Sequence, residues 1–214
     1  MTRAELIRRL QDSRLVAVLR SKTAEEAMVT AKSAASAGVK FVEITLSVPG
    51  ALEVIAAFAS EKTVHIGAGT VLSKKQAEAA ITAGARFVVS PSSELDLIPI
   101  CHDADVACYP GAATPTEIYA AARAGADLVK IFPADCLGGP NFIRQMAGPF
   151  PDIHFMVSGG VSLTNVKEYV HAGVTGICLG SAFLANALAE QGERGLVNEV
   201  KEFVKSVGRA KSQN

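Results

Sequence analysis

One recurring dipeptide constrains the fold of this chain more than any other feature. Ala-Gly occurs six times, and at four of these positions it follows a stretch with helical spacing, mostly alanine-rich, and stands just before a short apolar run. Glycine commonly ends a helix, because it adopts the left-handed backbone conformation without a steric penalty. The repeat therefore predicts helices that end at Ala-Gly 37–38, 83–84, 124–125 and 172–173. The apolar runs that follow them are FVEITL (41–46), FVVSP (87–91), LVKIFP (128–133) and GICLGS (176–181).

Four further apolar runs lie between these, which makes eight candidate strands. They are LVAVL (15–19), VHIGA (64–68), VACYP (106–110) and IHFMV (153–157). Strands that are apolar nearly throughout and alternate with helices indicate a parallel sheet buried on both faces. The helical segments often open with a hydroxyl residue that can cap a helix. These residues are Thr23, Ser73, Thr114 and Thr164.

Eight strand-plus-helix units in 214 residues predict an α/β fold, the (β/α)8 or TIM barrel. We expect one domain over residues 1–214, with a short amphipathic helix at about 2–13 before the first strand. An open doubly wound sheet is the structural alternative. The first strand is followed by LRSKTAEEA and not by a GxGxxG turn, which disfavours that alternative.

Composition and charge exclude several classes of partner. The 21 basic and 21 acidic residues cancel, so the chain lacks the net positive charge typical of proteins that bind nucleic acid or anionic membranes. Trp is absent and aromatic residues make up 6%, which disfavours a base-stacking platform. The N-terminal segment is too charged for a signal peptide, and no apolar run approaches membrane-spanning length. We expect a soluble cytoplasmic protein that binds neither nucleic acid nor membrane.

The residue types that usually carry metal or hydrolase chemistry lack the necessary spacing. The four histidines show no HExxH or similar pattern, the four cysteines form no CxxC pair, and no serine stands in GxSxG. We expect no metal, no other cofactor and no serine-hydrolase triad.

Two charged residues lie inside apolar strands, where they have no solvated face. Lys130 is in LVKIFP and Glu43 in FVEITL. Burial disfavours a charged ammonium and a charged carboxylate, which yields nucleophilic amines and proton-transferring acids. An amine and a carboxylate that share a barrel lumen suit Schiff-base chemistry. The alternatives are a lysine that reaches the surface and a structural ion pair of Glu43 with Lys130 or Arg20.

Polar residues and glycines at strand ends form a second set of candidates. Arg20 closes the first strand and can bind a carboxylate or phosphate at the barrel mouth. GAGT (67–70), SGG (158–160) and LGS (179–181) follow three of the strands. The last two strands of such barrels commonly end in a phosphate site, built from backbone N–H groups and a helix N-terminus. Two tight turns without a ligand are the alternative.

Several motifs together resemble one family. VAVLR, VEITL, GAGTVL, VSP, YPGAATPTE, VKIFPA and SGGV occur in order from about Leu15 to Ala182. The chain resembles the 2-keto-3-deoxy-6-phosphogluconate (KDPG) aldolases, which are class I aldolases of the Entner–Doudoroff pathway. The resemblance implies a homotrimer of barrels that needs no metal and releases pyruvate and D-glyceraldehyde 3-phosphate from a phosphorylated 2-keto-3-deoxy sugar acid.

The resemblance also implies roles for single residues. Lys130 would form the Schiff base, and Glu43 would act as general acid and base. The remaining members of the site would bind substrate. Arg20 and Thr70 would contact its pyruvyl part, and Thr45 lies on the strand face of Glu43. Pro91 and Phe132 would line the pocket. The substrate hydroxyls and phosphate would be held by Ser158, Gly159, Gly160, Gly180 and Ser181.

One departure from the family pattern leaves the substrate open. Some members carry arginine where this chain has Ser47, so Arg20 becomes the main candidate for an anion contact. The galactonate epimer and 4-hydroxy-2-oxoglutarate are alternative substrates. A phosphate-binding barrel isomerase or synthase would not need Lys130, and a catalytically silent binding protein would gain nothing from burying the pair.

Overall fold

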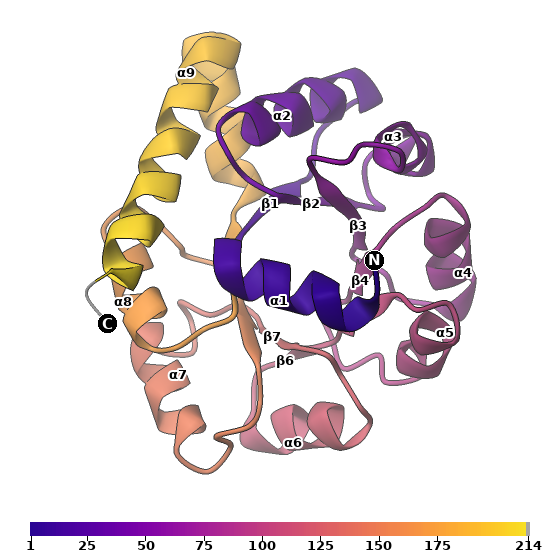
Figure 1. Cartoon of the computed structure of the whole chain (residues 1–214), viewed down its shortest axis with the longest axis vertical. Helices are drawn as coiled ribbons and strands as arrows, with labels where there is room; N and C mark the ends of the chain where they lie inside the picture. Colours follow the sequence, from indigo (N-terminus) through magenta and orange to yellow (C-terminus); the bar gives the residue numbers. More distant parts are fainter. Residues whose placement is uncertain (213–214) are drawn as a thin grey trace.

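A barrel of parallel strands surrounded by helices forms the centre of the protein (Figure 1). The structure is a computed structural model that describes residues 1–212. The strands are β1 (Leu15–Leu19), β2 (Phe41–Thr45), β3 (His65–Gly69), β4 (Phe87–Val89), β5 (Ala107–Tyr109), β6 (Gly111–Ala112), β7 (Val129–Ile131), β8 (Phe155–Val157) and β9 (Gly176–Leu179).

The hydrogen-bonded order of the strands confirms the predicted TIM barrel. The order is β5-β4-β3-β2-β1-β9-β8-β7-β6, and every pairing is parallel. The two strands at the ends of this order, β5 and β6, are consecutive in the chain and are joined by Pro110. β5 pairs with β4 and β6 pairs with β7, so this connection closes the barrel. Each of the eight apolar runs contains a strand. The ninth strand arises because Pro110 has no N–H to donate and divides one stave into two.

Alternation along the strands sorts their side chains between two hydrophobic clusters. On β2, Val42 and Ile44 pack outward against the helices, whereas Phe41 packs inside the barrel. The run that contains β7 behaves in the same way, with Val129 outside and Leu128 inside. Each strand is therefore buried on both faces, which explains why the sequence shows continuous apolar runs.

The helices lie around the outside of the barrel, and their ends agree well with the sequence signals. They are α1 (Arg3–Ser13), α2 (Ala24–Ser36), α3 (Ala51–Phe58), α4 (Lys74–Thr82), α5 (Leu97–Asp103), α6 (Pro115–Arg123), α7 (Pro140–Ala147), α8 (Val166–His171) and α9 (Ser181–Lys211). The glycine of each of the four Ala-Gly pairs predicted to end a helix has a positive φ, between 84° and 106°. No helix among residues 1–212 is both long and apolar enough to cross a membrane.

Three of the four expected N-caps are confirmed and one is wrong. Thr23, Ser73 and Thr114 each accept a hydrogen bond from the backbone N–H three residues later. Thr164 does not cap α8, whose N-cap residue is Asn165. The Thr164 hydroxyl is instead hydrogen-bonded to the hydroxyl of Ser162 at 2.7 Å. The local turn therefore uses the hydroxyl that the helix would have needed.

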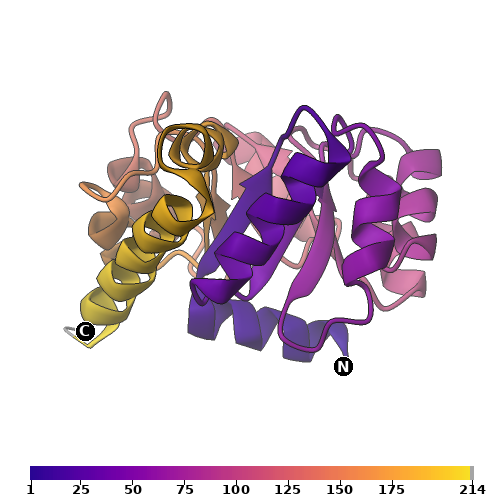
Figure 2. The ribbon, with the colours of Figure 1, turned by 90° about the horizontal axis from the view of Figure 1, so that it is seen from above.

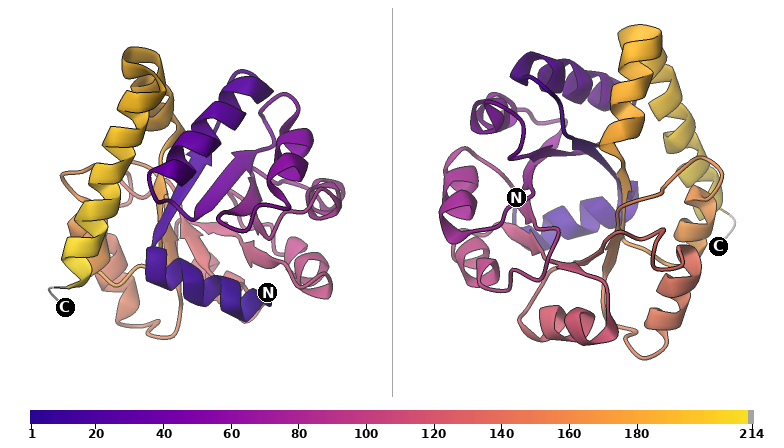
Figure 3. Two further views of the ribbon diagram at one scale, coloured as in Figure 1. Left: turned by 45° about the horizontal axis from the view of Figure 1, so that its top comes forward. Right: turned by 180° about the vertical axis from the view of Figure 1, so that it is seen from behind.

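Helix α1 closes the end of the barrel where the strands begin (Figure 2). Leu6 and Leu10 of this helix are fully buried in the inner cluster, together with Phe41 and Phe87. The opposite end, where the strands finish, faces the viewer in the right panel of Figure 3, with α1 behind it. Functional groups in this architecture gather at that second end, the mouth.

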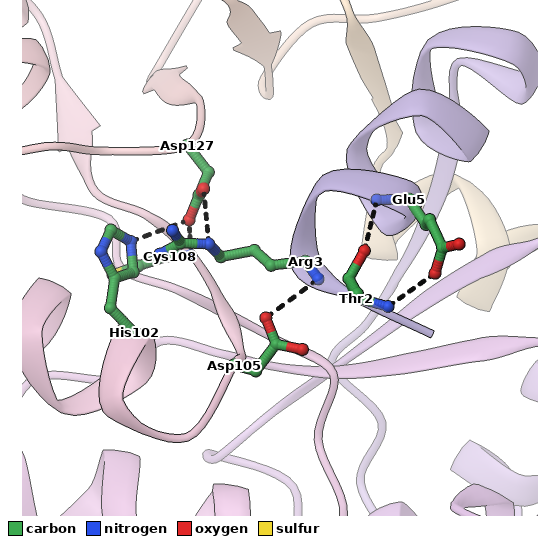
Figure 4. Close-up of polar contacts among 7 residues, drawn as sticks. All are labelled: Thr2, Arg3, Glu5, His102, Asp105, Cys108 and Asp127. Atoms are coloured by element: carbon green, nitrogen blue, oxygen red, sulfur yellow. Dashed lines mark hydrogen bonds and ion pairs between the residues drawn. The ribbon is translucent and has the colours of Figure 1, made fainter.

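A polar network around Asp127 fixes the start of α1 to the barrel (Figure 4). Asp127 Oδ1 lies 3.3 Å from Arg3 Nε, and its Oδ2 accepts the Cys108 N–H at 2.9 Å. His102 Nε2 lies 3.1 Å from the same Oδ2. The Arg3 N–H also donates to Asp105 at 3.1 Å. One largely buried carboxylate thus connects α1 with α5, with β5 and with the segment before β7.

Candidate active site

The predicted pair of buried charges meets inside the barrel. Lys130 Nζ lies 3.9 Å from Glu43 Oε1. The two residues are 6% and 1% exposed, although each carries a long polar side chain. Both project inward because their neighbours on either side, Val42 and Ile44 on β2 and Val129 and Ile131 on β7, pack outward. A lysine at the surface is excluded, and the amine and carboxylate share the lumen.

Two glycines of GAGT make room for this arrangement. A Cβ at Gly69 would lie 2.0 Å from Glu43 Oε1, and a Cβ at Gly67 would lie 2.4 Å from the Phe87 ring. GAGT was expected to follow its strand, but β3 continues to Gly69. The glycines of this motif therefore let the Glu43 carboxylate and the Phe87 ring pack against β3.

One carboxylate oxygen of Glu43, Oε2, is buried without a hydrogen-bond partner among the described residues. Burying a carboxylate oxygen without a partner costs free energy that a purely structural ion pair would avoid. The free oxygen is therefore available to a substrate hydroxyl or a water molecule.

Phe132 and Cys178 lie near the Lys130 amine. The Phe132 ring centroid lies 5.4 Å from Lys130 Nζ, and this ring is 36% exposed, so it can form a pocket wall. Cys178 of β9 is buried in the inner cluster. Burial, together with the negative charge of Glu43, raises the pKa of the Cys178 thiol to about 12. Cys178 consequently stays protonated at neutral pH and does not compete with the lysine.

Arg20 and Thr70 meet at the mouth, one after β1 and the other after β3. Arg20 Nη2 donates a 3.4 Å hydrogen bond to Thr70 Oγ1, and Thr70 has a positive φ of 57°. Arg20 is exposed, so most of its guanidinium donors can reach an anion.

Thr45 is at the same end of the barrel, but its hydroxyl already has hydrogen-bond partners within the protein. Its hydroxyl donates to the Leu19 carbonyl at 3.0 Å and is hydrogen-bonded to Ser47 at 2.8 Å. Thr45 is only 1% exposed. The geometry therefore joins the ends of β1 and β2 through Thr45 and does not present this hydroxyl to the mouth.

Pro91 lies two residues beyond β4 and is half-buried. Its backbone carbonyl packs against Gly111 of β6, where an added Cβ would lie 2.3 Å from the Pro91 oxygen. This contact fixes the β4 loop against the next stave.

Ser158, Gly159 and Gly160 follow β8. The Ser158 N–H donates to the Ile131 carbonyl at 3.1 Å, and both glycines have a positive φ. The sequence did not identify Asp135, which packs against this loop. A Cβ at Gly160 would lie 2.3 Å from the Asp135 Cβ and 2.7 Å from its Oδ2. A negative charge therefore lies beside the SGG loop.

Gly180 and Ser181 begin α9 directly after β9. Gly180 is the N-cap residue, and no side chain accepts a hydrogen bond from the first turn of the helix. Such a helix start offers free backbone N–H groups and a partial positive charge, which together suit an anion. A Cβ at Gly180 would meet nothing within 4 Å, so open space adjoins these donors.

Metal-binding geometry is lacking in the part of the chain that the structure describes. No group of three or more His, Cys, Asp or Glu side chains among residues 1–212 could hold a metal ion. The arrangement as a whole combines a buried amine, a buried carboxylate, an exposed arginine and an uncapped helix start around one barrel mouth.

Comparisons with known proteins agree with this geometry. The family model described as KDPG and KHG aldolase matches residues 6–200. A 2-dehydro-3-deoxy-phosphogluconate aldolase of Pseudomonas aeruginosa is 36% identical over 185 residues, which cover 86% of this chain and 84% of the relative.

Two solved structures are similar over nearly the whole chain. One, described as native KDPGal, is 32% identical with a TM-score of 0.83 and covers 92% of this chain and 96% of its own. The other is the KDPG aldolase of Legionella pneumophila, with pyruvate captured as a covalent carbinolamine intermediate. It is 25% identical with a TM-score of 0.76 and covers 94% of this chain and 95% of its own.

Proposed function

Because the chain belongs to the KDPG and KHG aldolase family, we propose that it cleaves KDPG to pyruvate and D-glyceraldehyde 3-phosphate through an imine on Lys130. The observation that carries the proposal is the buried Lys130 amine 3.9 Å from a buried carboxylate with a free oxygen. The pyruvate carbinolamine of the Legionella relative supports the same chemistry.

The proposed reaction uses Lys130 as an electron sink. Its neutral amine attacks the C2 ketone of the substrate, and the carbonyl oxygen leaves as water to give a protonated imine. Glu43 takes the proton of the C4 hydroxyl, and the C3–C4 electron pair moves into the imine as the aldehyde departs. Protonation of the resulting enamine at C3 and addition of water release pyruvate and restore the free lysine.

We assign the carboxylate of the pyruvyl part to Arg20, with Thr70 beside it. An arginine fork forms two parallel hydrogen bonds with a carboxylate, and the Thr70 contact already orients this guanidinium. Ser47 replaces the arginine of some relatives, so Arg20 would carry this charge without help from the β2 loop. Phe132 and Pro91 would form the walls of the substrate pocket. Thr45 would affect substrate binding only indirectly, through its hydrogen bonds at the end of β2.

We assign the phosphate mainly to the start of α9. Gly180 and Ser181 would offer backbone N–H groups, and Ser158, Gly159 and Gly160 would contribute on the neighbouring loop. Asp135 lies against that loop and would repel a phosphate placed directly on it. The uncapped helix start is therefore the stronger half of the proposed phosphate site.

The C4 configuration of the substrate distinguishes this proposal from its alternatives. The similarity to the native KDPGal structure makes the galactonate epimer an alternative substrate. The family description, KDPG and KHG aldolase, makes 4-hydroxy-2-oxoglutarate another. Cleavage of both C4 epimers and of 4-hydroxy-2-oxoglutarate, with coupled detection of pyruvate, tests the proposal. We expect the highest kcat/KM for the gluconate epimer. Release of pyruvate from none of the three would overturn the aldolase assignment.

We further propose that the chain is a single domain, that it assembles as a homotrimer and that it works in the cytoplasm. Its four cysteines are all free, which suits a reducing compartment. Sedimentation equilibrium tests the trimer, because a monomer of 22.3 kDa would have one third of the expected mass.

A further inference from the structure

Basic residues gather at the closed end of the barrel, away from the mouth. Lys40 directly precedes β2, His65 is the first residue of β3, and Arg86 directly precedes β4. Arg9 comes from α1, and Lys62 comes from the loop between α3 and β3. Catalysis at the mouth does not require positive charge at the opposite end.

Two adjoining hollows lie among these basic residues. One has a volume of about 320 Å³ and is bordered by Arg9, Lys62, His65 and Arg86. The other has a volume of about 450 Å³ and shares Arg9, Lys62 and His65 with the first, with Lys40 in addition. Because the two hollows share these three residues, they adjoin each other, and we call the pair the basic groove. Its volume suits a small molecule.

Within the described residues, the positive charges of the groove have no acidic partner at ion-pair distance, although the Arg86 guanidinium donates a hydrogen bond to the Met1 carbonyl. Among residues 1–212, Arg9, Lys40, Lys62 and Arg86 form no ion pair within 4.0 Å, whereas Arg3 on the same helix pairs with Asp127. The groove is bordered by only two carboxylates, Glu61 and Asp12, one in each hollow. Four cations without an ion-pair partner therefore border the two adjoining hollows.

His65 borders both hollows, and the neighbouring positive charges affect its pKa. Its ring packs on Phe41 with 4.9 Å between the ring centroids. Burial lowers the pKa of the His65 imidazole below its ordinary value of 6.5, and three nearby positive charges lower it further. These charges belong to Arg9, Arg86 and Lys40.

We infer that this groove binds a small multivalent anion, a phosphate or a polycarboxylate, at a site separate from the barrel mouth. Arginine forks and lysine ammonium groups are the donors that proteins use for such anions. The anion would bridge Arg9 on α1 to Lys62 and Arg86 on the barrel.

Two measurable consequences follow from such a bridge. An anion bound only by the folded chain raises the melting temperature with its concentration. A negative charge beside His65 favours the protonated imidazole, so anion binding should raise the pKa of His65 and tighten as the pH falls through it. Glu61 and Asp12, one in each hollow, are acidic and oppose the binding of an anion.

The test is a titration of the isotope-labelled protein with inorganic phosphate or with citrate, followed through the imidazole resonances. The His65 resonance is assigned by its loss in His65→Gln. We expect either anion, against chloride at equal ionic strength, to raise the pKa of His65. A response to citrate alone would support the site and assign it to polycarboxylates, whereas a response to phosphate alone would support it and assign it to phosphates.

Charge-removing variants separate this groove from binding at the mouth. Lys62→Gln and Arg86→Gln should each weaken the anion affinity about tenfold, whereas Lys75→Gln on the exposed face of α4 should leave it unchanged. Lys40→Gln provides a second test should Arg86→Gln fail to fold. No anion-dependent change at His65, or equal affinities in Lys62→Gln and Lys75→Gln, would overturn the inference.

Discussion

Replacing Gly180 with alanine tests the proposed phosphate site with little structural cost. Gly180 has φ −66° and ψ 146°, a conformation that alanine adopts freely. A Cβ there meets no atom within 4 Å, so the folded chain accommodates it. Removing a glycine in a compatible conformation commonly stabilises a protein by roughly 0.4–1 kcal/mol. Gly160 is less suitable, because a larger residue would collide with Asp135 before it affected any ligand.

The expected effect falls on substrate binding. A methyl group beside the start of α9 would hold the phosphate away from the backbone N–H groups. Each hydrogen bond to a charged group contributes roughly 1.5–3 kcal/mol, so the loss of one raises KM about 10–100-fold. KM for 4-hydroxy-2-oxoglutarate, which carries no phosphate, should stay nearly unchanged, and pyruvate should still form its imine.

The assay compares KM for the two substrates in Gly180→Ala and in a matched control. Gly208→Ala lies in the second part of α9, beyond a kink at Gly192, and its added Cβ also meets no atom within 4 Å, so it should change neither value. Equal increases for both substrates, or none for KDPG, would refute the phosphate assignment at α9.

Three further substitutions test other parts of the account. Glu43→Gln should reduce kcat by roughly 10²–10⁴-fold, because the amide accepts no proton, while the pyruvate imine should still form. Near wild-type turnover in stopped-flow assays would contradict the acid–base role of Glu43. Gly69→Ala should also reduce kcat strongly, since its Cβ would displace Glu43, and an unchanged kcat in a folded variant would be incompatible with the geometry. Asp127→Ala should reduce the free energy of unfolding, measured in urea, by about 1–3 kcal/mol. The control Asp96→Ala breaks an exposed ion pair with Lys74 and should change this free energy little. Equal effects of the two substitutions would argue against a stabilising role of the Asp127 network.

Much of the fold was predictable because local signals and tertiary structure agree. The four Ala-Gly pairs that precede apolar runs end their helices with positive-φ glycines, and each apolar run contains a strand. The juxtaposition of Lys130 and Glu43 was also predictable, because strand alternation fixes which residues face the lumen. Thr164 was assigned wrongly, since a cap and a local turn compete for the same hydroxyl.

Other features depend on contacts between distant segments, which no local pattern encodes. The role of Gly69 depends on Glu43, 26 positions earlier on the neighbouring strand. Asp135 is an unremarkable loop residue until the fold places it against Gly160. The basic groove draws its charges from α1 and from the segments before three strands, so the balanced composition of the chain conceals it.

Reductive trapping of pyruvate tests the central claim most directly. Incubation with pyruvate and borohydride should inactivate the enzyme irreversibly and attach one pyruvyl-derived group, because hydride reduces the imine to a stable amine. Mass spectrometry of the tryptic peptides should locate that group on Lys130, the buried amine 3.9 Å from Glu43. Modification at another lysine, or full activity after treatment, would contradict the account.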